Sequence, residues 1–370
     1  MRDYTEAFIG IDAAKAKNAV AVAEGGRGGE VRWFGEVDAS PESMRRTIGK
    51  IAAKYDEVHV CYEAGPTGYG LHRLIRELGH ACTVVAPSLI PKKPGDRIKT
   101  NRRDATTLAR LLRAGELTAV WVPDGTCEAM RDLVRARIAA VQALRACRQQ
   151  VSGFLLRQGR IWSGEKTWTL AYEAWAGKQR FEQPAQEIAI SEMLQAVREA
   201  KARIRRLEVV IARQVEGWSM APVVRAMMAL RGVDLIVAAT IAAELGEIGR
   251  FSHPRGLMAY VGLVPSERST GKQVRRGGIT KAGNSRVRHM LVQAAWTYRH
   301  PPRIGAKKQL RIDQAPPGVA EIAWKAQTRL YAKHKAMNRR GKKSTVICTA
   351  LARELIGFVW AVARQACADA

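Results

Sequence analysis

The sequence predicts a mixed α/β domain at the N-terminal end, followed by a mainly helical remainder. Short β-branched runs alternate with helix-like segments up to about residue 112, whereas later segments carry apolar residues at helical spacing. With 370 residues, of which 47% are hydrophobic, the chain is long enough to form two or three domains with substantial cores.

The N-terminal elements are predicted from apolar runs that are bounded by turn residues. We expect strands at residues 7–12, 18–23, 31–37, 58–62 and 82–85, and helices at residues 43–54, 71–78 and 101–112. Strands that alternate with helices indicate a mixed sheet with helices packed on its faces. The basic, Pro-rich stretch 87–100 is expected to be a loop that leads into the last of these helices.

The middle of the chain, residues 125–216, has the spacing of two long amphipathic helices. Apolar residues recur every three, four or seven positions within 130–155 and again within 193–215. A connector rich in tryptophan joins these helices, so we expect an antiparallel coiled coil. Such an element serves equally well as a spacer, as a dimerisation element or as an arm that holds a nucleic acid.

The remainder, from about residue 221, is predicted to be helical with basic loops. Residues 230–246 are expected to form two short helices around a glycine turn, which either direct backbone amides at phosphates or form an ordinary helical hairpin. Residues 268–288 contain seven Lys or Arg and no Asp or Glu. Hydroxyls and glycines among these charges favour a flexible loop that contacts phosphate over a merely solvated face. The candidate nucleic-acid-binding residues are Arg268, Lys272, Arg275, Arg276, Lys281, Arg286 and Arg288.

The charge of the chain also indicates its partners. The 61 Lys and Arg residues exceed the 34 Asp and Glu residues and give a formal net charge of +27. This excess favours a nucleic-acid partner over a membrane surface. No run approaches the roughly 18 uninterrupted apolar residues of a membrane-spanning helix, and no secretory signal is visible. Because the six cysteines have no CxxC spacing, we expect a reducing cytoplasm and no disulfide or zinc site.

Four polar side chains form a candidate metal site in the N-terminal domain. Asp12 and Glu63 end predicted strands, while Asn101 and Asp104 are three residues apart and share one face of a helix. Hard cations such as Mg²⁺ take oxygen ligands that separate elements bring together. This arrangement is similar to the ribonuclease-H-like one, in which two metal ions activate attack on a phosphodiester. The alternative is that these carboxylates merely end their strands.

The sequence resembles the DEDD-type transposases of the insertion sequence 110 family over nearly its whole length. IGIDAAKAKNAVAV carries Asp12, VCYEAGPTGYGLHRLI carries Glu63, and KTNRRDATTLARLL carries Asp104 with Asn101 where the family has a further acid. The longest and most specific match is AYVGLVPSERSTGKQVRRGGITKAGNSRVRHMLVQAAW, in the C-terminal part.

This resemblance implies a domain organisation and a mechanism. Residues 1–120 would form a RuvC-like catalytic domain that binds Mg²⁺, residues 121–218 a coiled-coil insertion, and residues 219–370 the C-terminal transposase domain. A serine of that last domain attacks DNA in the family and forms a covalent phosphoserine. Thr270 occupies its position here. We favour Thr270 over the adjacent Ser269 because neighbouring residues of an extended segment point in different directions.

The resemblance also implies partners. The substrates would be donor and target DNA, chosen by a structured noncoding guide RNA, the bridge RNA. The protein would act as a homodimer or homotetramer at the bacterial nucleoid, in the cytoplasm and away from any membrane. The replacements at Asn101 and Thr270 keep two alternatives open. One is a catalytically impaired relative that binds RNA and DNA without cutting, and the other is a nuclease that uses water as its nucleophile.

Overall fold

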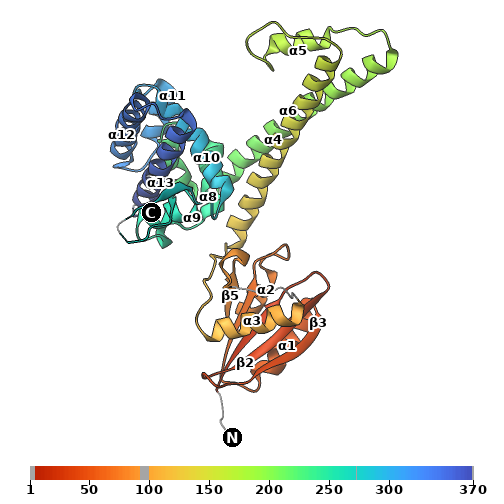
Figure 1. Cartoon of the computed structure of the whole chain (residues 1–370), viewed down its shortest axis with the longest axis vertical. Helices are drawn as coiled ribbons and strands as arrows, with labels where there is room; N and C mark the ends of the chain where they lie inside the picture. The colour runs from red at the N-terminus through yellow and green to blue at the C-terminus, as the bar shows by residue number, and fades with distance from the viewer. Residues whose placement is uncertain (1–4, 92–99, 272, 369–370) are drawn as a thin grey trace. The chain divides into compact units, whose positions relative to one another are not determined.

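The computed structural model describes residues 5–91, 100–271 and 273–368, which belong to two compact units, Met1–Val122 and Pro123–Ala370 (Figure 1). The first unit contains a five-stranded sheet with the order β3-β2-β1-β4-β5. Strand β1 pairs antiparallel with β2 and parallel with β4, so the predicted mixed sheet is confirmed. The strands are β1 (Glu6–Asp12), β2 (Lys17–Glu24), β3 (Val31–Asp38), β4 (Glu57–Glu63) and β5 (Ala81–Val85).

The two faces of this sheet differ in the size of their side chains. On one face, helices α1 (Pro41–Ala52) and α2 (Gly70–Glu77) contribute to a core of bulky residues. This core includes Ile9, Ile11 and Tyr62 of the sheet. Helix α3 (Asn101–Arg113) packs on the other face against small residues, mainly the alanines of β2. Because successive residues of a strand point to opposite faces, this difference follows from the alternation of large and small residues along β1 and β2.

The backbone of α3 approaches β1 most closely at Gly10. A Cβ atom on Gly10 would lie 2.3 Å from the carbonyl oxygen of Ala105 and 2.4 Å from the amide nitrogen of Ala109. The helix begins at a defined place because the Thr100 hydroxyl accepts a hydrogen bond from the amide of Arg103 at 3.3 Å. The cap and the missing side chain together fix the first turn of α3 near the end of β1.

Adding one methyl group at Gly10 is expected to destabilise the first unit. The Gly10→Ala variant should unfold about 1–3 kcal/mol more easily in urea, because the new Cβ overlaps helix backbone that cannot move away cheaply. Gly49→Ala is the matched control, since its Cβ enters open space on α1 and alanine favours a helix. Equal stability of Gly10→Ala and the wild-type protein would contradict the close packing of α3.

Two helices of 33 residues each, α4 (Gly125–Arg157) and α6 (Pro184–Glu216), dominate the start of the second unit and pack along each other (Figure 1). A connector that contains α5 (Leu170–Gly177) joins them and adds Tyr172 and several tryptophans to a small aromatic core. An ion pair of 2.6 Å between Arg137 and Glu208 links the two helices. We refer to α4, α5 and α6 with their connector as the arm.

The rest of the second unit is mainly helical, as predicted. Its elements are α7 (Ala221–Met228), α8 (Leu235–Leu245), α9 (Pro254–Tyr260), β6 (Pro265–Glu267), β7 (Arg276–Ile279), α10 (Ser285–Ala295), α11 (Ala306–Asp313), α12 (Val319–Arg339) and α13 (Ser344–Ala368). The expectation of two helices within residues 230–246 is wrong, because α7 already ends at Met228. That stretch forms a turn around Gly232, with φ at +77°, and then the single helix α8.

Helix α13 contains one segment, Ser344–Cys367, that is long and apolar enough to cross a membrane, with a mean hydropathy of 1.8. Half of that segment is buried within the protein, where it packs against α7, α9, α10 and α12. Arg353 and Glu354 interrupt its apolar run, which is why the sequence did not suggest a membrane helix. The burial is typical of the central helix of a folded core.

Candidate active site and nucleic-acid interface

Asp12 and Glu63 lie at the same edge of the sheet and on the same face. They are the last residues of β1 and β4, which are neighbouring parallel strands. The residues two positions earlier, Gly10 and Cys61, both contact α3, and the Cys61 thiol donates to the carbonyl oxygen of Leu108 at 3.5 Å. Because side-chain direction repeats every two residues, both carboxylates are directed to the α3 face.

Helix α3 brings Asp104 and Asn101 to this face, as the sequence predicts for a shared helix face. Asp104 lies in the first turn, and its side chain is partly buried. Asn101 is exposed, and its side-chain nitrogen donates to Glu36 of β3 at 3.4 Å. Glu36 pairs with Ala19, a residue of the α3 face, and so extends the acidic edge of the site.

Glu36 was missed by the sequence analysis. The signal that could have found it is the alternation along β3, where every second residue is exposed. Alternation alone does not show which residue of β3 contacts α3, because Glu36 and Asn101 are 65 positions apart in the sequence.

The side chains at this edge offer the right atoms for a hard cation, but they are not gathered into a closed cluster. Within the described ranges, no three His, Cys, Asp or Glu side chains lie close enough to hold a metal ion. The oxygens of Asp12, Glu63 and Asp104 are of the type that Mg²⁺ prefers. The donor chemistry therefore fits a divalent cation, and the arrangement is an open edge.

The basic segment after α9 is a β-hairpin and not the flexible loop expected from the sequence. Strands β6 and β7 pair, and beyond them the amide of Arg268 donates to the carbonyl oxygen of Arg275 at 2.9 Å. The ladder continues to Thr270 and Gln273, whose backbone groups exchange two hydrogen bonds of 3.1 Å. Gly271 permits the turn, because its φ of +57° suits a residue without a side chain. Lys272 lies outside the described residues.

The two candidate nucleophiles have different surroundings in this hairpin. The Ser269 hydroxyl donates to one carboxylate oxygen of Glu267 at 2.8 Å, and Arg276 donates to the other at 3.3 Å. These hydrogen bonds, that of Ser269 first, lower the pKa of Glu267, so a charged acceptor stands beside the Ser269 hydroxyl at neutral pH. Thr270 lies one residue further, at the turn, where its backbone groups bond to Gln273.

The predicted phosphate-binding residues divide into exposed and structural ones. Arg268, Arg275, Arg276, Lys281 and Arg286 are exposed on the hairpin and at the start of α10. Arg288 is partly buried, and one of its terminal nitrogens donates to the carbonyl oxygens of residues 261 and 282 at 2.8 and 2.9 Å. Arg288 therefore links the residue before the hairpin, Val261, to the residue after it, Ala282.

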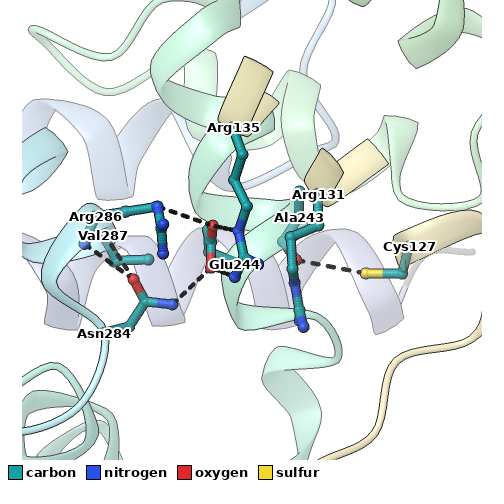
Figure 2. A network of polar contacts seen from close by, with 8 residues as sticks. All are labelled: Cys127, Arg131, Arg135, Ala243, Glu244, Asn284, Arg286 and Val287. Atoms are coloured by element: carbon teal, nitrogen blue, oxygen red, sulfur yellow. Dashed lines mark hydrogen bonds and ion pairs between the residues drawn. The ribbon is translucent and has the colours of Figure 1, made fainter. Parts of the chain in front are cut away.

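A buried carboxylate, Glu244 of α8, joins this basic segment to the arm (Figure 2). Its side chain is 1% exposed and accepts hydrogen bonds from Arg135 of α4 at 2.7 and 3.0 Å. Asn284 donates to it at 2.8 Å, and Arg286 lies 3.9 Å away. Burial alone would raise the pKa of Glu244, but the hydrogen bonds from Arg135 and Asn284 outweigh burial and lower it.

Glu244 was also missed by the sequence analysis, although a signal for it exists. It is the one charged residue in the otherwise apolar helix LIVAATIAAEL. A buried carboxylate is costly unless it is paired, so a lone Glu in such a helix predicts a specific basic partner. The identity of the partner does not follow from the sequence.

The exposed, basic hairpin of the second unit is typical of a protein that binds polynucleotides, and the strand-end carboxylates of the first unit offer oxygens of the type that hard cations prefer. Comparison with known proteins gives the family. A transposase model of the DEDD type matches residues 9–158, and the model described as Transposase IS116/IS110/IS902 family matches residues 224–309. The chain belongs to the IS110 family of transposases, enzymes that cleave and rejoin DNA. The resemblance predicted from the sequence motifs is thus confirmed.

Two of the similar proteins cover nearly the whole chain, and a third covers about two thirds of it. The candidate transposase y4qE of Sinorhizobium fredii is 62% identical over 98% of this chain and 90% of the relative. The transposase for insertion sequence element IS1533 of Leptospira borgpetersenii is 27% identical, over 91% of this chain and 98% of the relative. A probable family 20 transposase of Pseudomonas aeruginosa is 29% identical over 64% of this chain and 70% of the relative.

The exposed arginines lead to a prediction about salt. Binding to duplex DNA should weaken steeply as salt rises, and replacing Arg275, Arg276 and Arg286 by Gln should flatten the slope of log K against log salt by up to about three units, because fewer counterions are released. The matched control neutralises Arg46, Lys50 and Lys54, which are exposed on α1 and its C-terminal turn. Fluorescence anisotropy at several salt concentrations gives the slopes. A slope that changes equally in both variants would contradict a role of the hairpin in binding.

Proposed function

We propose that this transposase is a Mg²⁺-dependent DNA recombinase whose RuvC-like first unit holds the cation at the open edge formed by Asp12, Glu63, Asn101 and Asp104. The observation that carries the proposal is that two strand-end carboxylates and the first turn of α3 share one edge and one face of the sheet. When bound, Mg²⁺ would polarise the scissile phosphate.

Asn101 fits this role through its carbonyl oxygen. Its side-chain nitrogen is engaged by Glu36, which orients the amide with the oxygen at the opposite side. An oxygen without charge binds Mg²⁺ more weakly than a carboxylate does, and the nearby Glu36 returns a negative charge to this part of the site. The replacement of an acid by Asn101 is therefore compatible with cation binding.

We propose a hydroxyl of the hairpin as the nucleophile. Its oxygen forms a bond to the phosphorus of the DNA, the bond from phosphorus to the leaving strand breaks, and that strand departs as an alcohol after taking the proton that the nucleophile loses. The hydroxyl proton passes to a carboxylate, and Glu267 is already hydrogen-bonded to Ser269. The alignment with the family motif favours Thr270 as the nucleophile, whereas the hydrogen bond to Glu267 favours Ser269. We choose Ser269 because of this hydrogen bond. Arg268, Arg275 and Arg276 would stabilise the charge on the phosphate.

The remaining proposals concern partners. We propose that a structured noncoding RNA guides the protein to donor and target DNA at the bacterial nucleoid, and that the protein acts as a homodimer or homotetramer. The net charge of +27 supports binding to more than one polyanion. The arm would form the coiled coil expected from its heptad-like spacing. The second candidate is a relative that binds RNA and DNA without cutting, which the uncharged Asn101 favours.

The carboxylates of the open edge lead to a prediction about cleavage. Asp12→Ala, Glu63→Ala and Asp104→Ala should each abolish Mg²⁺-dependent strand cleavage, because each removes an oxygen ligand, while DNA binding and thermal stability stay close to wild type. Asn101→Asp should hold or raise activity. Asp56→Ala is the control, an exposed acid just before the opposite end of β4. Cleavage at the wild-type rate in EDTA, or by the Asp12 variant, would rule out this metal site.

The nucleophile is tested by mapping the covalent adduct. Ser269→Ala should abolish the protein–DNA adduct and Thr270→Ala should reduce it less, because Glu267 holds only the Ser269 hydroxyl in position. The control is Ser285→Ala, which removes an exposed hydroxyl at the start of α10. Mass spectrometry of the DNA-linked peptide identifies the residue. An adduct on Thr270 would restore the assignment by register, and cleavage without any adduct would assign the attack to water.

A further inference from the structure

We propose that Glu244 is a positioning residue that holds the root of the β6–β7 hairpin in place against α4 and α8. The residues that carry this proposal all lie in the second unit, and Figure 2 shows Glu244 with Arg135, Asn284 and Arg286. The first part of the proposal, that Glu244 fixes the position of the hairpin, does not depend on whether the protein cleaves DNA. Its consequence for DNA cleavage rests on the proposed function of the hairpin.

Asn284 is the link between Glu244 and the hairpin. Its side-chain oxygen accepts from the amides of Arg286 and Val287, both at 3.1 Å, and so caps α10. Its side-chain nitrogen donates to Glu244 at 2.8 Å. Because both ends of the amide are engaged, the orientation of Asn284 is fixed by the helix on one side and by Glu244 on the other.

The chain just before Asn284 is clamped by contacts between backbone atoms. A Cβ atom on Gly283 would lie 1.9 Å from the carbonyl oxygen of Tyr260, and one on Gly262 would lie 2.2 Å from that of Ala282. The amide of Lys281 donates to the carbonyl oxygen of Gly262 at 3.1 Å. The root of the hairpin is therefore tightly packed, whereas its tip is exposed.

The charge of Glu244 indicates why a carboxylate stands at this place. Arg135 binds it with two nitrogens, and Arg286 approaches from α10 at 3.9 Å. A buried ion pair is weak evidence for stability, since apolar residues of the same volume often serve as well. The carboxylate instead fixes orientation. It accepts hydrogen bonds from Arg135 of α4 and from Asn284 at the hairpin root, and such bonds form only over a narrow range of distances and angles. Glu244 thus couples the arm to the hairpin.

This coupling matters because attack on a phosphate requires close alignment. A displacement of about 1 Å of a reacting group costs on the order of 100-fold in rate. The hairpin hydroxyls stand on an exposed tip, so their position depends on how firmly the root is held. Glu244 is therefore expected to affect the rate of cleavage and not the affinity for DNA.

Two variants and one control test the proposal. Glu244→Gln removes the charge. Asn284→Ser keeps an oxygen that caps α10, but its shorter side chain lacks the amide group that donates to Glu244. Glu354→Gln is the matched control, because Glu354 is a 22% exposed carboxylate of α13 that binds Arg329 at 2.9 Å and Lys333 at 2.6 Å. If Glu244→Gln fails to fold, Asn284→Ser still carries the test.

The first measurement is amide hydrogen exchange of residues 261–284 in the protein alone. We expect exchange to be faster by about tenfold or more in both variants, because the root opens more often, and to be unchanged in the control. Unchanged exchange in both variants, or equally faster exchange in Glu354→Gln, would overturn the proposal. Because no DNA is present, this result stands even if the wild-type protein proves unable to cleave.

The second measurement is single-turnover cleavage at saturating DNA. The cleavage rate should fall by about tenfold or more in Glu244→Gln and Asn284→Ser, while Kd for DNA changes by less than about threefold. The control should keep the wild-type rate. A wild-type rate in both variants, with a loosened root, would overturn the catalytic consequence. If the wild-type protein itself does not cleave, the proposed function fails, and the exchange result alone decides the role of Glu244.

Discussion

The close approach of α3 to β1 is the constraint on which the candidate metal site depends. The helix can lie this close because Gly10 has no side chain and because alanines line both surfaces around it. Larger residues would lift the helix from the sheet and carry its first turn away from the strand ends. Asp104 lies in that turn. The small residues that let α3 pack closely are therefore also what places the Asp104 carboxylate near the strand ends.

In the second unit, too, glycines allow two backbone segments to approach closely. Gly262 and Gly283 let two backbone segments touch, and the contact holds the root of the hairpin. Arg288 adds its hydrogen bonds to the same segment, and Glu244 adds a buried, charged anchor. In both units the candidate functional groups lie at an open edge or an exposed tip, while glycines let the supporting backbone segments pack closely. Rigid support with exposed groups suits an enzyme whose substrate is a large polymer.

Short-range patterns predicted much of this structure. The apolar runs of β1 and β4 predicted the strands and placed Asp12 and Glu63 at their ends, because a short run bounded by turn residues needs no long-range information. The hairpin was not predicted, since basic residues and glycines show no apolar alternation. The contacts of Asn101 with Glu36 and of Glu244 with Asn284 span 65 and 40 positions, and no local rule reports such contacts. The end of α7 at Met228 was missed because the apolar turn that follows resembles a helix.

The candidate sites of the two units differ in charge, and under the proposed function this difference separates DNA binding from DNA cleavage. The open edge of the first unit collects carboxylates, which repel a phosphate until a cation neutralises them. The hairpin of the second unit carries arginines that attract a phosphate without any cation. Glu267 keeps Arg276 of the hairpin in a fixed direction, because it accepts a hydrogen bond from that guanidinium. Glu244 does the same for Arg135 of α4. In the proposed reaction the protein can therefore hold DNA in the absence of metal, whereas cleavage waits for the cation that makes the acidic edge compatible with DNA.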